Sequence, residues 1–294
     1  MERLLIIDGH SYAYRAFHAI RELHSPSGQP TNAIYGFIKM AAKLRASVVP
    51  THWIAVWDGG LSAERMAVLP EYKAQRPEMP EGLRPQLDEI VDYLNAARVA
   101  SFCREGIEAD DVIACIARRA ELMNWTVVIA SSDKDFMQLV SPRVGLLNPH
   151  DKTETVWTNE QVRAKTGVEP SQIVDWLSLT GDNVDNIPGV PGVGPKTAAE
   201  LLKQFGSVEK LFERLEEVKS ERLRAALVVA QEAVRRNREL VRLHDVACDI
   251  SPEEMTVKTP DTERLSALYS RWGFKTLLSA LKETVSRECQ AVLI

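Results

Sequence analysis

The sequence has no long apolar run that could cross a membrane. Its 294 residues are 45% apolar, yet no stretch approaches the ~20 consecutive apolar residues that span a bilayer. The opening residues, MERLLIIDGHSYAY, hold one basic residue and a short apolar run, which is typical of a first β-strand and not of a signal peptide. We therefore expect a cytoplasmic protein with no membrane partner.

Cysteine is also scarce, and the sequence lacks several familiar catalytic motifs. The cysteines are Cys103, Cys115, Cys248 and Cys289, and none form the C-x-x-C pair of a common zinc site. They are predicted to be buried free thiols in a reducing compartment. There is no G-x-S-x-G elbow, and GVGPKT does not complete a nucleotide phosphate loop. Catalysis by a protein nucleophile is not indicated.

Neither sign of charge dominates the chain as a whole. Lys and Arg total 36 and Asp and Glu total 41, for a net charge of −5, which alone argues mildly against nucleic acid. The distribution is uneven, because residues 11–50 hold five basic side chains against one acid. Basic surface can therefore exist locally, and the positions of the acids become the stronger clue.

Three short apolar runs lead into an aspartate. LLIID ends at Asp8, WIAVWD at Asp58 and TVVIASSD at Asp133, with helical patterns between the runs. Alternation of strands and helices predicts an α/β fold with a central, mostly parallel sheet flanked by helices. Because parallel strands end along one edge, we expect these three aspartates to converge there.

The helical patterns divide the chain into regions. We expect Thr31 to cap a helix over residues 32–45, and a second helix near residues 84–97 to bury Leu87, Ile90, Val91 and Leu94. The predicted regions are an α/β domain over residues 1–165, with an arch-like excursion at about 60–85, a helical region over 166–260, and C-terminal helices and a tail over 261–294.

Nine carboxylates stand in places that suggest a metal site. They are Asp8, Asp58, Glu108, Asp110, Asp111, Asp133, Asp135, Asp182 and Asp185. Any one of them could be a turn residue or a helix cap, but strand-end acids together with E-x-D-D and D-x-x-D are hard to explain that way. Uncompensated carboxylates repel each other, and oxygen ligands suit two Mg²⁺ or Mn²⁺ ions. Two such ions can activate water for hydrolysis at phosphorus.

A glycine-rich turn follows the last two of these acids. Residues 188–195, PGVPGVGP, precede a helix, so the backbone around Gly192 and Gly194 can present N–H groups to a phosphate, supplemented by Lys196. A plain turn between helices is the alternative. The pattern resembles the helix–hairpin–helix modules that bind DNA without reading its sequence.

Taken in order, these motifs resemble the 5′-nuclease family, and specifically the N-terminal 5′→3′ exonuclease domain of bacterial DNA polymerase I. The matching segments are IIDGHSYAYRAFHA, NAIYGF, YKAQRPEMPEGLRPQ, EADDVIA, SSDKDFMQLV and LTGDNVDNIPGVPGVGPKTAAELL. The similarity extends to about residue 283, and no polymerase region follows it. We therefore expect either a free-standing exonuclease or a fragment of a larger polymerase.

The resemblance implies roles for individual residues. A first metal would be bound by Asp8, Asp58, Glu108 and Asp110, and a second by Asp133, Asp135, Asp182 and Asp185, with Asp111 between them or holding waters. Lys73 and Arg76 would contact the scissile phosphate, Tyr72 would stack on a base, and Arg15 would contact another phosphate. Related hairpins also bind K⁺ through backbone carbonyls, so the resemblance implies a K⁺ site at this hairpin.

The resemblance predicts a metal-dependent 5′→3′ exonuclease and flap endonuclease. It would act on DNA with 5′ ends or flaps in primer removal and repair, as a monomer beside a separate DNA polymerase. Two other functions remain open from the sequence: a DNA-structure-binding module without catalysis, and a ribonuclease with similar acids on a similar sheet. Retention of all nine acids argues against the first, and the hairpin region argues against the second.

Overall fold

The computed structural model describes residues 1–151 and 155–291 and divides into two compact units. The first comprises Met1–Trp57, Met79–Cys103 and Asp249–Ile294, and the second comprises Asp58–Glu78 and Arg104–Cys248. Within the described ranges, none of the helices combines the length and hydropathy that crossing a bilayer requires.

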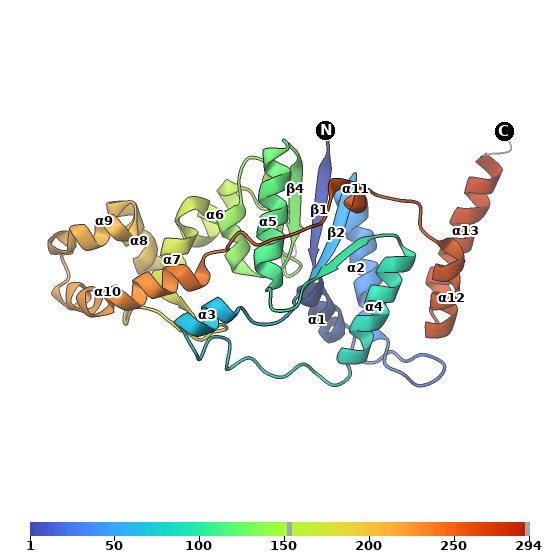
Figure 1. Ribbon diagram of the computed structural model, residues 1–294, viewed down its shortest axis with the longest axis horizontal. Coiled ribbons are helices and arrows are strands. Elements are labelled where there is room, and N and C mark those ends of the chain that lie inside the picture. Colours follow the sequence, from blue (N-terminus) through green and yellow to red (C-terminus); the bar gives the residue numbers. More distant parts are fainter. Residues whose placement is uncertain (152–154, 292–294) are drawn as a thin grey trace. The chain divides into compact units, whose positions relative to one another are not determined.

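The first unit is built on the parallel strands β1 (Arg3–Asp8), β2 (His52–Trp57) and β3 (Ala100–Cys103), with β2 in the middle. β2 is buried throughout, as expected for a parallel strand covered on both faces. Helices α1 (Gly9–Ala19), α2 (Asn32–Val48) and α4 (Arg84–Ala96) lie beside these strands (Figure 1). The unit also contains α11 (Pro252–Met255), α12 (Thr262–Trp272) and α13 (Lys275–Ala291).

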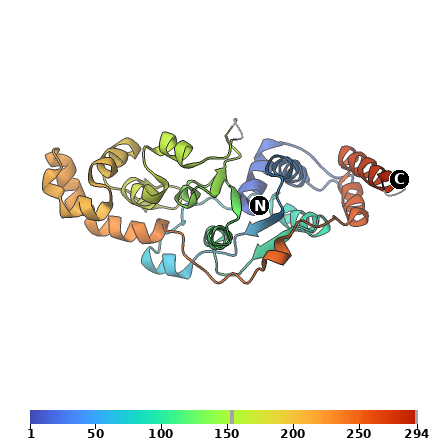
Figure 2. The same ribbon diagram turned by 90° about the horizontal axis from the view of Figure 1, so that it is seen from above.

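The second unit pairs β4 (Thr126–Ala130) in parallel with β5 (Val144–Leu147), and α5 (Ala109–Leu122) packs against β4. Its other helices are α3 (Ala63–Val68), α6 (Asn159–Thr166), α7 (Ile173–Thr180), α8 (Pro195–Phe205), α9 (Val208–Glu213) and α10 (Glu221–Val241), with the 3₁₀ turns η1 (Lys134–Leu139), η2 (Pro170–Gln172) and η3 (Leu215–Glu217). Strands β6 (Gly181–Asp182) and β7 (Ile187–Pro188) form a small antiparallel hairpin between α7 and α8. The yellow and orange helices group at one end of this unit (Figure 2).

The predicted fold class, a parallel sheet flanked by helices, is confirmed. β1 ends at Asp8, Asp58 follows β2 directly, and β4 ends at Ala130, before Asp133. Strands β3 and β5 were not predicted, because neither is an unbroken apolar run. β3 is half-exposed, and β5 contains Gly145, where a Cβ would meet the Val156 side chain at 2.3 Å.

The predicted N-cap position of α2 is confirmed, but the hydrogen bond expected of its side chain is not found. Thr31 holds the N-cap position, but its side chain makes no capping hydrogen bond. The Gln86 side chain performs that role instead, since its Oε1 accepts from the N–H groups of Ala33 at 2.8 Å and Ile34 at 3.3 Å. Gln86 is thus buried in the first unit, whereas Leu87 and Val91 on α4, which were expected to be buried, are only half-buried.

Candidate metal centre

Carboxylates from two elements of the second unit meet at one place. Asp135 lies in η1, just after β4, and Asp182 and Asp185 belong to the β6–β7 hairpin; their oxygens lie within 4.8 Å of one another. Asp133 caps η1 by accepting from the Asp135 N–H at 2.9 Å, and Asp182 accepts from the Val184 N–H at 3.0 Å. These local hydrogen bonds hold the turns that aim the acids. We call Asp133, Asp135, Asp182 and Asp185 the aspartate cluster.

The negative charge of the aspartate cluster is poorly compensated. Burial, reinforced by the carboxylates of Asp133 and Asp182, raises the pKa of Asp135 well above its ordinary value. Burial also raises the pKa of Asp133. Asp135 Oδ1 is buried and accepts no hydrogen bond from the described residues. A divalent cation would supply the missing charge and partner, and the oxygen-only ligand set fits Mg²⁺ or Mn²⁺.

Two partly exposed cations reach the aspartate cluster. Arg76 Nη2 lies 2.5 Å from Asp185 Oδ1, and Lys134 Nζ lies 3.0 Å from Asp182 Oδ1. The two side chains are 37% and 40% exposed, so solvent screens both ion pairs. Lys134 was not singled out in the sequence, although its place between Asp133 and Asp135 was a usable signal.

A different arrangement surrounds Glu108, at the N-terminus of α5. Glu108 is 1% exposed, and its carboxylate lies 3.1 Å from Lys73 Nζ and accepts from the Tyr72 hydroxyl at 3.2 Å. Lys73 is also buried, at 5% exposed, and has a left-handed φ of 57°; its N–H donates to the Asp185 carbonyl at 3.0 Å. The predicted catalytic lysine therefore lies between Glu108 and the hairpin that carries Asp185.

Burial and charge act in opposite directions on Lys73. Burial alone would lower the pKa of its ammonium group, but the carboxylates of Asp110 and Glu108 outweigh burial and raise that pKa. Burial raises the pKa of the Tyr72 hydroxyl, reinforced by Asp185. Lys73 is therefore cationic and Tyr72 is neutral at physiological pH. Tyr72 is 4% exposed, and its stacking on a base stays a prediction.

The other predicted acids occupy separate positions. Asp110 is half-buried in the first turn of α5, and Asp58 is half-buried and accepts from the Gly60 N–H at 3.1 Å. The loop after Asp58 is tied to the loop before Glu108, since the Gly59 N–H donates to the Ile107 carbonyl at 3.1 Å. Asp111 contacts Arg65, an arginine that the sequence interpretation did not single out.

Two predicted site residues belong to the first unit. Asp8 is buried at the end of β1 and caps α1 by accepting from the Ser11 N–H at 3.0 Å. Arg15 is half-buried on α1. The roles of Asp8 as a metal ligand and of Arg15 as a phosphate contact stay predictions.

The glycine-rich turn is open to solvent. Gly192, Gly194 and Lys196 are all exposed, and Gly192 has a φ of 82°. Gly194 has an ordinary φ of −92°, and a Cβ there would meet nothing within 4 Å. The fold of this chain therefore does not require glycine at position 194. A ligand that approaches the backbone from solvent would require it, because a side chain there would stand in its way.

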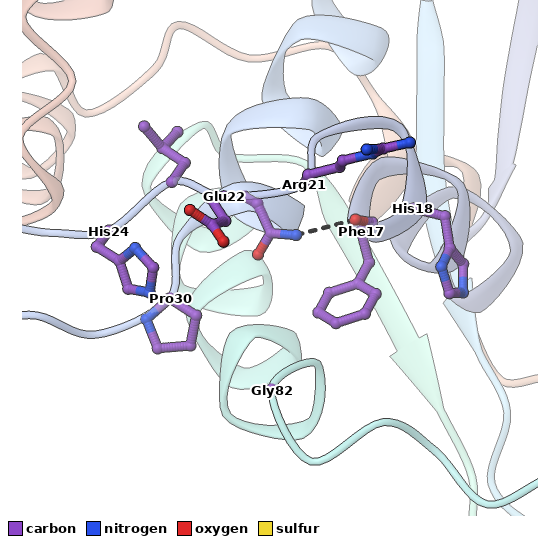
Figure 3. A pocket seen from close by; sticks show the side chains of 9 residues that line it. Phe17, His18, Arg21, Glu22, His24, Pro30 and Gly82 are labelled. Atoms are coloured by element: carbon purple, nitrogen blue, oxygen red, sulfur yellow. Dashed lines mark hydrogen bonds between the residues drawn. The ribbon is translucent and has the colours of Figure 1, made fainter.

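A separate hollow lies in the first unit and has different chemistry (Figure 3). It measures about 460 Å³ and lies between the end of α1, the loop that follows it and Gly82. Its lining includes Arg21, His18 and His24, with Glu22 as the acid among the lining residues. It does not offer the oxygen ligands of the aspartate cluster.

An α/β fold that brings carboxylates together without histidine or thiolate ligands is typical of proteins that bind divalent cations. The N-terminal resolvase-like domain of 5′-3′ exonucleases matches residues 3–167, and their C-terminal SAM fold matches residues 168–263. The chain belongs to the 5′-3′ exonuclease family.

Individual relatives agree with that membership. A 5′-3′ exonuclease of Aquifex aeolicus is 38% identical over 294 residues and is covered completely, as is this chain. The DNA polymerase I of Bacillus caldotenax is 38% identical over 290 residues, which cover 98% of this chain and 33% of that protein. The chain thus spans about a third of the length of that polymerase. The predicted family and the predicted enzyme class, a 5′→3′ exonuclease, are confirmed.

Solved structures share the fold at lower identity. The T5 5′-exonuclease with bound divalent metal ions (zinc) has a TM-score of 0.69 at 24% identity, covering 96% of this chain and 99% of that one. The catalytic core of Rad2 in complex with a DNA substrate has a TM-score of 0.65 at 17% identity, covering 92% and 88%. These similarities establish the 5′-nuclease fold that the sequence predicted.

Proposed function

We propose that this protein is a metal-dependent 5′→3′ exonuclease and 5′-flap endonuclease that hydrolyses DNA to 5′-phosphate and 3′-hydroxyl ends. The aspartate cluster carries the proposal, because its crowded carboxylates, and an Asp135 Oδ1 that has no hydrogen-bond partner among the described residues, suit a bound cation. The full-length similarity to the Aquifex aeolicus exonuclease supports the reaction. A phage T5 protein of the same fold, solved with DNA and metal ions, is described as a flap endonuclease, which supports the second activity.

We assign one Mg²⁺ or Mn²⁺ to the aspartate cluster. For a second ion we keep the predicted ligands Asp58, Glu108 and Asp110 of the second unit, and Asp8 of the first unit stays a prediction. Bound divalent ions would activate the attacking water and stabilise the leaving oxygen. The ammonium group of Lys73 and the guanidinium group of Arg76 would neutralise charge that develops on the scissile phosphate. Arg76 must leave Asp185 to do so, and its partial exposure makes that exchange easy.

The glycine-rich turn would hold DNA away from the cleavage site. Backbone N–H groups near Gly192 and Gly194, the N-terminus of α8 and Lys196 together suit one phosphate. The open space around Gly194 supports this role, since a side chain there would obstruct a phosphate and nothing else. Binding of K⁺ by this turn stays a prediction.

The cellular part of the proposal is primer removal and repair in the cytoplasm, on the nucleoid. We propose that the protein acts as a monomer and that a DNA polymerase fills the gaps it leaves. The similarity to an N-terminal third of DNA polymerase I supports a polymerase partner.

The test uses a 5′-labelled flap duplex, a matched RNA flap and a single-stranded DNA, with Mg²⁺ and with EDTA. The proposal expects Mg²⁺-dependent release of short 5′ DNA products by the wild type and none by Asp182→Asn. Faster cleavage of the RNA flap would identify a ribonuclease. Tight binding of the DNA flap without any cutting by the wild type would leave a DNA-structure-binding protein.

The DNA grip is tested separately with Gly194→Ala. We expect unchanged thermal stability and a DNA affinity lower by about 10-fold, which corresponds to the loss of one charge-assisted phosphate contact. An unchanged affinity would remove the turn from the DNA-binding surface. Glu232→Gln, on the exposed surface of α10, is the control.

A further inference from the structure

Arg65 is a buried arginine whose hydrogen-bonding capacity is completely used. It lies on α3, is 4% exposed, and all five of its guanidinium N–H groups have an acceptor. Its Nη1 donates to Asp111 Oδ2 at 2.6 Å and Glu108 Oε2 at 2.8 Å, and its Nη2 donates to Asp111 Oδ1 at 2.8 Å and the Arg242 carbonyl at 2.9 Å. Its Nε donates to the Leu240 carbonyl at 3.0 Å. A buried charge is stable only when it is paired and hydrogen-bonded this fully.

Arg65 and its acceptors connect three segments of the second unit: α3, the start of α5 and the end of α10. Glu108 and Asp111 belong to the start of α5, and Leu240 and Arg242 belong to the end of α10, where helix carbonyls lack partners and favour a cation. In Figure 1, α3 lies beside this end of α10. Arg65 therefore fixes α3, and with it the chain that continues to Lys73 and Arg76, against both helices.

Asp111 differs in its surroundings from the aspartate cluster. Asp111 Oδ1 accepts from Arg65 and from the His244 N–H at 2.8 Å, and Oδ2 accepts from Arg65 in a two-pronged pairing. Asp135 Oδ1, by contrast, has no hydrogen-bond partner among the described residues. A divalent ion at Asp111 would lie beside the guanidinium group and be repelled by it.

We infer that Arg65 and Asp111 form a positioning pair, in which Asp111 anchors Arg65 and does not bind metal, and Arg65 holds the Lys73–Arg76 segment in place for phosphate contact. The catalytic consequence rests on the proposed function. The anchoring of Arg65 by Asp111 does not rest on it. An experiment can therefore refute the proposed function and leave the anchoring standing, or the reverse.

The pair predicts a specific kinetic pattern. Arg65→Gln and Asp111→Asn should each lower kcat by about 10²-fold, the effect of a small misplacement of catalytic groups, with little change in KM. The double variant should be no slower than the slower single variant, because both substitutions remove the same interaction. Arg65→Lys should recover only part of the rate, since an ammonium group cannot bridge two carboxylates and two carbonyls. Asp245→Asn, at an exposed ion pair of the same unit, is the matched control.

Two further measurements do not depend on cleavage. Amide hydrogen exchange over residues 62–76 should become faster in Asp111→Asn and Arg65→Gln but not in Asp245→Asn. Mn²⁺ affinity, measured by electron paramagnetic resonance, should change less than about threefold in Asp111→Asn. It should fall at least about tenfold in Asp182→Asn, since even the loss of an outer-shell partner of a metal ligand costs that much.

The outcomes separate the alternatives. Loss of Mn²⁺ affinity in Asp111→Asn as large as in Asp182→Asn, with normal exchange over 62–76, would make Asp111 a metal ligand and overturn the inference. Lower thermal stability with unchanged kcat would reduce the pair to a purely structural clamp and overturn its positioning role. If Arg65→Gln does not fold, Asp111→Asn and Arg65→Lys carry the test. A wild type that cuts nothing would refute the proposed function, while exchange and Mn²⁺ binding would still decide the anchoring.

Discussion

Two sets of buried carboxylates lie in the second unit, and they are compensated in opposite ways. Glu108 and Asp111 face Arg65 and Lys73, which are themselves 4% and 5% exposed. The aspartate cluster is paired with Arg76 and Lys134, which are both more than a third exposed, and buried Lys73 also acts on Asp133 electrostatically. Among the described residues, Asp135 Oδ1 has no hydrogen-bond partner. The first set carries its counter-charges within the fold, whereas the second requires a cation from solution. The difference indicates that the aspartate cluster is held ready for a ligand, whereas an ion at Glu108 would share that carboxylate with Arg65 and Lys73.

The largest expected effect comes from removing one charge of the aspartate cluster. Asp135→Asn should lower cleavage by about 10³-fold, since an electrostatic contact to the reacting groups is lost. The same substitution should raise the thermal stability of the metal-free protein, because the raised pKa of Asp135 shows that its ionised form is disfavoured there. Cleavage assays and thermal melts in EDTA measure both. If Asp135→Asn were less stable than the wild type in EDTA, the charge of Asp135 would not be uncompensated, and the contrast between the two sets of carboxylates would be wrong.

Removing the buried cation Lys73 should lower both the cleavage rate and the stability of the fold. Lys73→Met should lower kcat by about 10²-fold through loss of phosphate stabilisation. It should also destabilise the fold by roughly 1.5–3 kcal/mol, the range for a hydrogen bond to a charged group. The loss should be no larger because Arg65 and Tyr72 still compensate Glu108. Single-turnover rates and urea unfolding give the two values. A stability loss without a rate loss would remove Lys73 from catalysis.

The pH dependence of stability should distinguish metal-free from metal-loaded protein. Asp133 and Asp135 have pKa values raised above the ordinary value of 3.8, so the folded protein holds protons that the unfolded chain has already released. Their contribution therefore weakens stability as the pH rises through the raised pKa values. Unfolding in EDTA should show this loss between acidic and neutral pH. Saturating Mg²⁺ or the Asp135→Asn substitution should reduce it.

The smallest effect is expected at the rim of the aspartate cluster. Lys134→Ala removes a 40%-exposed partner of Asp182 and should change stability by no more than about 1 kcal/mol. It should tighten Mn²⁺ binding slightly, because a competing cation is gone. Titration calorimetry measures the affinity. If Lys134→Ala lost as much stability as Lys73→Met, the exposed Lys134 would stabilise the fold as strongly as the buried Lys73. The contrast between the two sets of carboxylates would then be wrong.

Local pattern was sufficient to predict much of the fold. The apolar runs ending near Asp8, Asp58 and Asp133 correspond to β1, β2 and β4. Gly206 follows the last residue of α8 with a φ of 86°, a conformation that glycine adopts readily. The acids of the β6–β7 hairpin and η1 lie together because short turns with fixed side-chain hydrogen bonds aim them. Such features depend on neighbours within a few residues, which a sequence displays directly.

Contacts between distant residues were not predictable in the same way. Gln86 caps α2 from 53 residues away, and Arg65 reaches Leu240 across a separation of 175 residues. In the sequence, Gln86 is one polar residue on an amphipathic helix and Arg65 is one basic residue in a mixed-charge stretch. Nothing in their own surroundings marks them as buried.

The sequence by itself determined the family, the α/β class and the carboxylates available to a divalent cation, because periodicity, turn residues and motif spacing are local properties of the chain. Only the tertiary structure decided which of those carboxylates remain uncompensated. Asp111 and Asp135 have the same side-chain chemistry, yet Asp111 accepts from Arg65 through both oxygens, whereas Asp135 Oδ1 accepts from none of the residues that the structure describes. The electrostatic state of a buried acid depends on the groups that folding brings within a few ångströms of it.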